Sequence, residues 1–363
     1  PETPGRNVHP PFIRLPTPEQ GEQLQALAAR LAAVTAEIAA LKARQSPENK
    51  TPVVAELQQK QAERKLLTQR HAELEASIPV SLVSKERADI RPAYVLKRGA
   101  YDQPGEQVQR NTPAFLPPLP ESDRLPTRLD LAHWVTDDEH PLTARVAVNR
   151  FWQQFFGVGL VRTSEDFGAQ GEFPTHPELL DDLAIRFVQS QWNVKALVRS
   201  IVLSKTYQQS SAAPTAAFQA DPQNRWLARG SRFRLDSEMI RDQILAVSGL
   251  LNTSMFGKSV KPPQPPNLWK SVSMKSSSTY SFEADTGDRI YRRSLYSFWK
   301  RAMPPPQMTI FDAPTRESCV ARRERTNTPL QALVLMNETQ YFHAAGTIAR
   351  RFAQDTQTPV ATR

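Results

Sequence analysis

A heptad pattern near the start of the chain constrains the fold more than any other feature of the sequence. Its six apolar positions step by three and four residues, the a/d spacing of a coiled-coil seam: Leu24, Leu27, Leu31, Val34, Ile38 and Leu41. Pro47 and Pro52 interrupt the pattern, and a second helical stretch then runs to about Ile78. A short turn bounded by prolines favours pairing within one chain. Residues 19–78 are therefore predicted to form an antiparallel helical hairpin, with a dimeric coiled coil as the alternative.

The rest of the chain divides into four segments. Residues 1–18 are proline-rich without periodicity and are predicted to be a linker. Residues 79–122 hold short β-like runs and turns, which predicts an extended connector. Helical patterns between proline-rich loops dominate residues 123–353, and 354–363 is expected to be a flexible tail. The predicted fold class is mainly α: an N-terminal antiparallel helical hairpin (coiled coil), then an irregular, loop-rich helical domain with a few short strands.

Cysteine and histidine usage bounds the cofactor chemistry. Cys319 is the single cysteine, so the chain can form no internal disulfide and no cysteine-based zinc or iron–sulfur site. The six histidines show no metal-ligand spacing, and the sequence contains no Cys-x-x-Cys-His motif for c-type haem. We therefore expect no metal site and no cofactor within this chain. Because no run of 18 apolar residues occurs, we also expect no transmembrane segment.

Basic residues concentrate between positions 289 and 325. This stretch holds nine basic and three acidic residues, a net +6 of the chain's +9. It includes residues 292–299, predicted to be a strand, and leads into a helix expected from Pro329, capped by Asn327 or Thr328. Guanidinium groups beside free helical N–H groups suit an anion. The candidate substrate- or anion-binding residues, including two from the earlier stretch 229–242, are Arg234, Arg241, Arg292, Arg293, Tyr296, Arg322, Arg323 and Asn327.

Two interpretations of these arginines stay open: a scaffold in which they pair with internal carboxylates, or a ligand site. Because Arg322 lies next to the expected helix cap, we expect Arg322→Ala to cost more stability than Arg293→Ala. The net charge alone also permits nucleic acid as a partner. The sequence lacks a helix-turn-helix, a zinc finger or interleaved basic and aromatic residues, so nucleic acid is ranked last.

Two pairs of residues are candidates for acid–base catalysis. Asp166 and His176 flank a glycine-containing loop that ends at a helix start, where a carboxylate and an imidazole could exchange protons. The alternative is that His176 caps or packs at the helix end. Glu238 and Asp242 stand four residues apart on one helix face. With Arg234 and Arg241 beside them, they could equally form a network of ion pairs.

Several long strings resemble one family, the planctomycete cytochrome-c-associated domain of unknown function, also called the PSD domain. The matching strings are Pro141–Trp152, Gly159–Thr163, Asp166–Gly171, His176–Leu180, Arg292–Tyr296, Phe311–Pro314 and Arg322–Leu333. The resemblance spans about 98–345. It implies a large exported protein, periplasmic or at the cell surface. Its N-terminal part often carries a c-type haem domain and sometimes a lectin-like module. It implies no established activity.

These observations support two hypotheses about function. The first is a module that acts on or binds a carbohydrate or another polar substrate, such as a small anionic molecule, with electrons passing to a haem domain elsewhere in the same polypeptide. The second is a non-catalytic binding or scaffold module, in which the arginines hold the fold together and the helical arm docks a partner. A polar pocket lined by both acids and arginines would favour the first. Arginine pairs that are already filled would favour the second.

Overall fold

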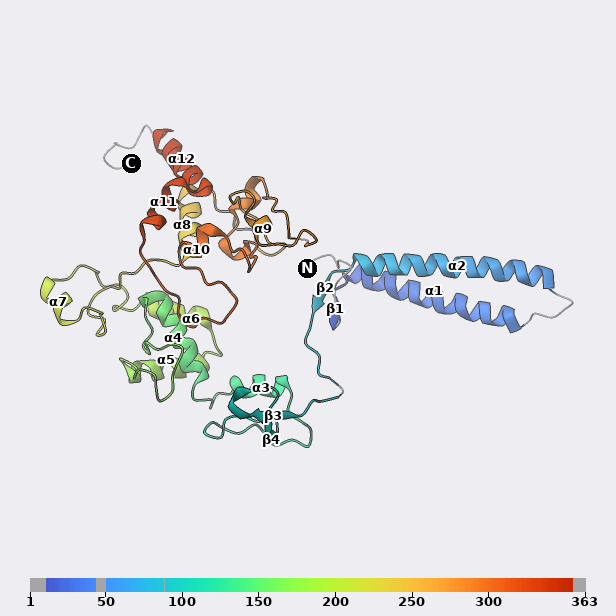
Figure 1. The fold of residues 1–363 in the computed structure, drawn as a ribbon, viewed down its shortest axis with the longest axis horizontal. Coiled ribbons are helices and arrows are strands. Elements are labelled where there is room, and N and C mark those ends of the chain that lie inside the picture. The colour runs from blue at the N-terminus through green and yellow to red at the C-terminus, as the bar shows by residue number, and fades with distance from the viewer. Residues whose placement is uncertain (1–10, 44–49, 88, 278, 355–363) are drawn as a thin grey trace. The chain divides into compact units, whose positions relative to one another are not determined.

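The chain is described here by a computed structural model, which places residues 11–43, 50–87, 89–277 and 279–354 (Figure 1). It is mainly helical, with 47% helix and 6% strand, as the sequence predicted. Two compact units are distinguished and each is described by itself: an N-terminal unit ending at Arg91, to which Phe256–Lys258 are assigned, and a C-terminal unit of the remaining residues from Pro92. The break in the hairpin at 44–49 and the predicted tail at 355–363 lie outside the described residues.

The N-terminal unit is a helical hairpin closed by a two-stranded sheet. Helix α1 (Pro18–Ala43) packs along α2 (Lys50–Ser77), and β1 (Phe12–Arg14) pairs antiparallel with β2 (Val80–Leu82) (Figure 1). The heptad prediction agrees with the burial pattern, since all six seam residues of α1 are buried or half-buried. The linker prediction for 1–18 did not include β1.

Charged groups complete the hairpin beside its apolar seam. Lys60 on α2 lies 2.5 Å from Glu37 on α1, and Arg30 on α1 lies 2.5 Å from Glu63 on α2. Two residues of the hairpin have no exposed surface: Val34 within α1 and Ile78 directly after α2. Burying an aliphatic side chain contributes about 1.5–3 kcal/mol each, whereas exposed ion pairs contribute about 0–1 kcal/mol. The seam therefore supplies most of the stability, and the ion pairs select the partner face.

Helix α1 has a second property that the sequence reading did not anticipate. Among the helices of the described residues, it alone is long and apolar enough to cross a membrane, with a hydropathy of 1.5 and 17% of that window buried. The core helix of a soluble protein and a signal sequence meet the same criterion. The expected absence of a transmembrane segment therefore stays a prediction.

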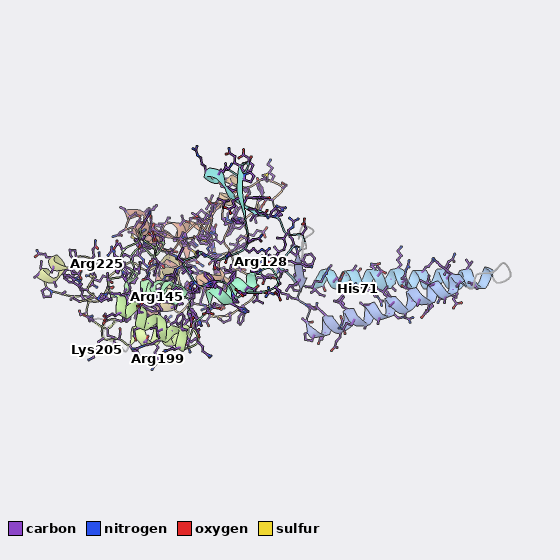
Figure 2. The ribbon with its side chains drawn as sticks, turned by 90° about the horizontal axis from the view of Figure 1, so that it is seen from below. His71, Arg128, Arg145, Arg199, Lys205 and Arg225 are labelled. Atoms are coloured by element: carbon purple, nitrogen blue, oxygen red, sulfur yellow. The ribbon has the colours of Figure 1, made fainter. Side chains whose placement is uncertain are left out.

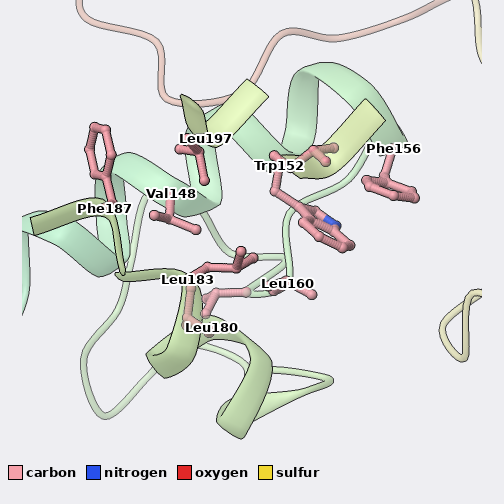
Figure 3. Packing of buried hydrophobic residues seen from close by; sticks show 10 residues of the cluster. Val148, Trp152, Phe156, Leu160, Leu180, Leu183, Phe187 and Leu197 are labelled. Carbon is pink, nitrogen blue, oxygen red and sulfur yellow. The ribbon is translucent and has the colours of Figure 1, made fainter. Parts of the chain in front are cut away.

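The first half of the C-terminal unit is organised around α4 (Thr143–Phe156). Helices α5 (Pro177–Gln189) and α6 (Val194–Val202) pack against it, and their apolar faces meet in one buried cluster (Figure 3). Trp152 and Phe156 stack within that cluster, with ring centres 4.1 Å apart. Helix α4 ends because Gly157 adopts the left-handed conformation at φ 82°. A Cβ at Gly157 would lie 2.8 Å from the Phe233 ring, so glycine is required there.

A buried amide fixes the loop that follows α4. Asn149 has no exposed surface, and it both accepts a hydrogen bond from Val161 N at 2.8 Å and donates one to Val161 O at 3.0 Å.

The second half of the unit centres on α8 (Ser237–Ser248), α11 (Pro329–Asn337) and α12 (Thr339–Gln354), with α12 packed against both α8 and α11.

The other elements are short. They are β3 (Ala93–Leu96), the 3-10 helix η1 (Lys97–Gly99), β4 (Pro104–Val108), α3 (Arg128–Val135), α7 (Thr215–Ala220), α9 (Leu268–Ser271), the 3-10 helices η2 (Gly287–Tyr291) and η3 (Ser294–Tyr296), and α10 (Pro306–Thr309). Strands β3 and β4 pair antiparallel. The strand expected at 292–299 is wrong: this stretch contains η3, and it meets neighbouring segments only in isolated bridges such as Asn252 with Arg292.

The two units predict the outcome of a deletion. A chain lacking residues 1–91 should still unfold in one cooperative transition, because the cluster around Trp152 is built from residues 147–227 alone. Its melting temperature should stay within about 5 °C of the intact chain's, a difference of ~1–2 kcal/mol for a domain of this size. Calorimetry on both chains measures this. A broad, non-cooperative transition in the shortened chain would contradict the division into two units.

Candidate functional site

The first turns of α8 carry three of the predicted site residues. The helix begins after Asp236, which stands at its N-cap, and ends at Gly249 in the left-handed conformation. Glu238, Arg241 and Asp242 follow within the next two turns. Carboxylates at the first turn of a helix interact favourably with the partial positive charge there. The local sequence therefore places acids where the helix itself stabilises them.

Two arginines from the segment before α11 bind these acids and form what we term the capping network: Asp236, Glu238, Arg323 and Arg325. Arg323 is bidentate on Glu238, with Nη1 to Oε2 at 2.6 Å and Nη2 to Oε1 at 3.2 Å. Arg325 Nε donates to Asp236 Oδ1 at 3.3 Å, and its Nη1 donates to the carbonyl of Gly157 at 2.8 Å. Parallel guanidinium–carboxylate bonds of this kind are among the strongest side-chain contacts.

The electrostatics of Glu238 reflect this pairing. Burial acts to raise the pKa of Glu238, but the hydrogen bond and the charge of Arg323 outweigh it, so the pKa lies below its ordinary value. For Arg323 burial acts to lower the pKa, and Glu238 reverses this, so its pKa is raised. Both shifts stabilise the ionised pair. A carboxylate held in that state is a poor general acid near neutral pH.

A third arginine, Arg234, binds two loop residues, Asp312 and Thr326. Arg234 forms an ion pair with Asp312 and donates from Nε to the carbonyl of Thr326 at 3.0 Å. Asp312 also accepts from the backbone N–H of Thr326 at 2.8 Å. Its φ of 60° lies in the left-handed region that a non-glycine residue rarely adopts. The pairing with Arg234 and Thr326 therefore holds Asp312 in a costly backbone conformation.

Arg241 lies at the centre of a separate, buried network. Its side chain has no exposed surface, and it donates to Gln340 Oε1 at 3.0 Å, to the carbonyls of Arg292 at 2.9 Å and Ile290 at 2.7 Å, and to Ser294 Oγ at 3.2 Å. Burial lowers the pKa of Arg241, which neighbouring Asp242 partly counteracts. Asp242 itself accepts two hydrogen bonds of 2.7 Å from Ser294. These contacts use the donors of Arg241 for structure.

The remaining predicted anion-binding residues do not converge. Arg292 stacks over Tyr296, with Cζ 3.7 Å from the ring centre, and donates to the carbonyl of Ser254 at 3.0 Å. Arg293 Nη2 contacts Met255 Sδ at 2.8 Å. Arg322 is half-exposed, 3.6 Å from Glu165. Asn327 is exposed, and the cap of α11 is Thr328, which forms a capping box with Gln331.

The proposed acid–base pairs are also separate in the structure. Asp166 Oδ1 accepts from Gly168 N at 2.7 Å, which closes a local turn. His176 is the N-cap residue of α5, with Nδ1 3.0 Å from Thr175 Oγ1. No hydrogen bond joins Asp166 to His176 within the described part of the chain. Glu238 and Asp242 share a helix but serve different arginines, so they form no common carboxylate site. Within the described residues no cluster of His, Cys, Asp or Glu could hold a metal ion.

A cavity of about 330 Å³, which the sequence analysis did not identify, lies between residues 222–233 and the end of α4. Its walls include Phe156, Phe218, Asn224, Arg229, Arg232 and Arg325, and no carboxylate lines it. The sequence signal was the string Arg229–Phe233, whose arginines stand close together, but nothing in the string indicates a cavity. Basic residues also lie elsewhere on the unit, for example Arg145 on α4 and Arg199 on α6 (Figure 2).

Comparison with known proteins gives one match. A family model described as PSD1, protein of unknown function (DUF1553), matches residues 127–362. No curated protein and no solved structure matches the chain. The matched residues include the capping network, the contacts of Arg234 and Arg241, and the cavity.

Adjacent arginines should differ sharply in their contribution to stability. Arg323→Ala should lower the free energy of unfolding by about 2–3 kcal/mol, because it leaves the half-buried Glu238 without its charged partner. Arg322→Ala should cost less than about 1 kcal/mol, since its ion pair with Glu165 is exposed on both sides. The sequence predicted a large stability cost for Arg322→Ala, and the exposed ion pair predicts a small one. Urea denaturation of the two variants tests it, and equal losses would contradict the geometry.

Two glutamates of the C-terminal unit, Glu238 and Glu338, predict opposite pH dependence of stability. The pKa of Glu238 is lowered in the folded chain, so its stabilisation is present above the ordinary value and is lost as pH falls through the folded pKa. Burial raises the pKa of Glu338, so its stabilisation is present at acidic pH and is lost as pH rises through the folded pKa. Glu238→Gln should therefore be most destabilising near pH 7, and Glu338→Gln most destabilising near pH 4. Melting temperatures from pH 3.5 to 7.5 decide this, and parallel curves would refute it.

Proposed function

Because the chain belongs to the PSD1 family of proteins of unknown function, we propose that its 127–362 part is a non-catalytic binding module for a carbohydrate or another polar ligand. In this proposal the arginines form the scaffold of the module, and the cavity beside α4 is where a ligand would bind. The helical hairpin of α1 and α2 would serve as an arm that docks a partner.

One observation carries the proposal: each of the four acid–base candidates already has a structural partner. Glu238 binds Arg323, Asp242 binds Ser294, Asp166 closes its own turn, and His176 contacts Thr175. A general acid or base must present a proton, or accept one, within hydrogen-bond reach of a substrate. Side chains that already hold structural contacts support a scaffold role instead.

The wider setting is also a proposal, supported by the sequence resemblance alone. We propose that the module belongs to an exported protein, periplasmic or at the cell surface, whose haem domain lies elsewhere in the same polypeptide. The chain has no Cys-x-x-Cys-His motif, so it would contribute no covalent haem attachment. Electron transfer from a bound substrate to that domain would require a catalytic group in this chain. The four acid–base candidates already hold structural contacts, which favours binding over turnover. Nucleic acid stays the least favoured partner.

The proposal predicts binding without turnover. Titration calorimetry against a panel of neutral and acidic mono- and oligosaccharides should detect at least one ligand, and chromatography after prolonged incubation should show each saccharide unchanged. The variants Asp166→Asn and His176→Gln should bind as the parent chain does, because neither residue lines the cavity. Product that appears with the parent chain and disappears in either variant would overturn the proposal. So would the absence of any binding across the panel.

A further inference from the structure

The cavity beside α4 combines three arginines with aromatic walls. Residues 222–224 and 229–233 form one side, and Phe156 and Gly157 at the end of α4 form another. Its volume of about 330 Å³ stands at the small end of the ~300–1,000 Å³ typical of ligand sites. A cavity of this size suits a single ring or a short chain rather than an extended polymer.

Charge within the cavity is unevenly compensated. Arg325 is paired with Asp236, at 3.3 Å. Arg229 is buried, donates to the carbonyls of Asp221 at 2.7 Å and Pro222 at 3.1 Å, and stacks on Phe218 at 4.3 Å. Both are therefore held in place by the protein. Carbonyl groups solvate the guanidinium of Arg229, and the buried carboxylate of Asp221 interacts electrostatically with it.

Arg232 differs from the other two arginines. It is exposed, lines the same cavity, and makes no hydrogen bond or ion pair with any described residue. The other two arginines of the lining each interact with a carboxylate, Arg229 with Asp221 and Arg325 with Asp236, whereas Arg232 has none among the described residues. An anionic group beside Arg232 would supply that partner and would receive charge-assisted hydrogen bonds.

Asn224 adds an unsatisfied acceptor. Its Nδ2 donates to the carbonyl of Arg229 at 2.8 Å, whereas its Oδ1 is buried and has no partner among the described residues. A buried acceptor without a donor costs about 1–3 kcal/mol. A ligand hydroxyl could supply the missing donor. The rings of Phe156, Phe218 and Phe233 line the cavity as well and offer apolar surface to the body of a ligand.

We propose that this cavity binds one small hydroxylated carboxylate of sugar-acid type, such as a hexuronic acid, with its carboxylate at Arg232. This deepens the proposed function and rests on it, since it assigns the site and the ligand class of the binding module. The arginines select the carboxylate, Asn224 receives a hydroxyl, and the aromatic rings cover the apolar face of the sugar. Neutral sugars lack the group that Arg232 would bind.

The test compares glucuronate with glucose and with acetate on the intact chain, by titration calorimetry. Glucuronate should bind, and both glucose and acetate should bind at least about tenfold more weakly, the minimum effect of losing one charge-assisted hydrogen bond. Arg232→Gln should weaken glucuronate binding by about tenfold or more. The control is Arg289→Gln, another exposed arginine, which lies outside the cavity and should change the affinity by less than about twofold.

The possible failures have different meanings. Equal affinity for glucuronate and glucose, or glucuronate binding that survives Arg232→Gln, overturns the assigned site while leaving a binding module in place. Consumption of glucuronate with loss of turnover in Asp166→Asn overturns the non-catalytic function instead. Since Arg232 has no partner among the residues that the structure describes, its variant should melt as the parent chain does, which makes a loss of binding attributable to the ligand contact.

Discussion

The second half of the C-terminal unit depends on one buried guanidinium. Arg241 has no exposed surface, and removing a cation from water is costly unless the protein replaces its hydrogen bonds. Two backbone carbonyls, a serine and a glutamine do so, and they come from η2, the start of η3 and the first turn of α12. Of these segments, η2 and η3 are short. The chain bends between residues 287 and 297, and these bends bring two carbonyls and the hydroxyl of Ser294 to the guanidinium of Arg241.

The sequence predicted those parts of the fold that repeat a local pattern. The seam of α1 was visible because its apolar residues recur every three or four positions, whatever the rest of the chain does. The helical patterns of residues 123–353, including the helix that carries Glu238 and Asp242, were visible for the same reason. The strand expected at 292–299 failed because this stretch is shaped by the Arg241 network: the carbonyl of Arg292 accepts a hydrogen bond from Arg241, and Ser294 Oγ donates to Asp242.

The site could be predicted only as a set of residue types. The sequence identified Glu238 and the arginines near 323, but the two are 85 residues apart, and no local rule states which arginine reaches which acid. Arg322 and Arg323 are neighbours with opposite surroundings, one at the surface beside Glu165 and one bound to the first turn of α8. The cavity was invisible for a related reason. Its walls come from residues 156–158, 211–233 and 325, and a hollow between distant segments leaves no motif.

The span of the Arg241 network has a consequence for the order of folding during synthesis. Gln340 follows Arg241 by 99 residues, so at ~5–20 residues per second the ribosome would deliver this partner roughly 5–20 s after the arginine. During that interval water must solvate the guanidinium, and α8 has no α12 to pack against. The cluster around Trp152, made of residues 147–227, has no such delay. The nascent chain would therefore gain its first core early and complete its second only after α12 has been synthesised.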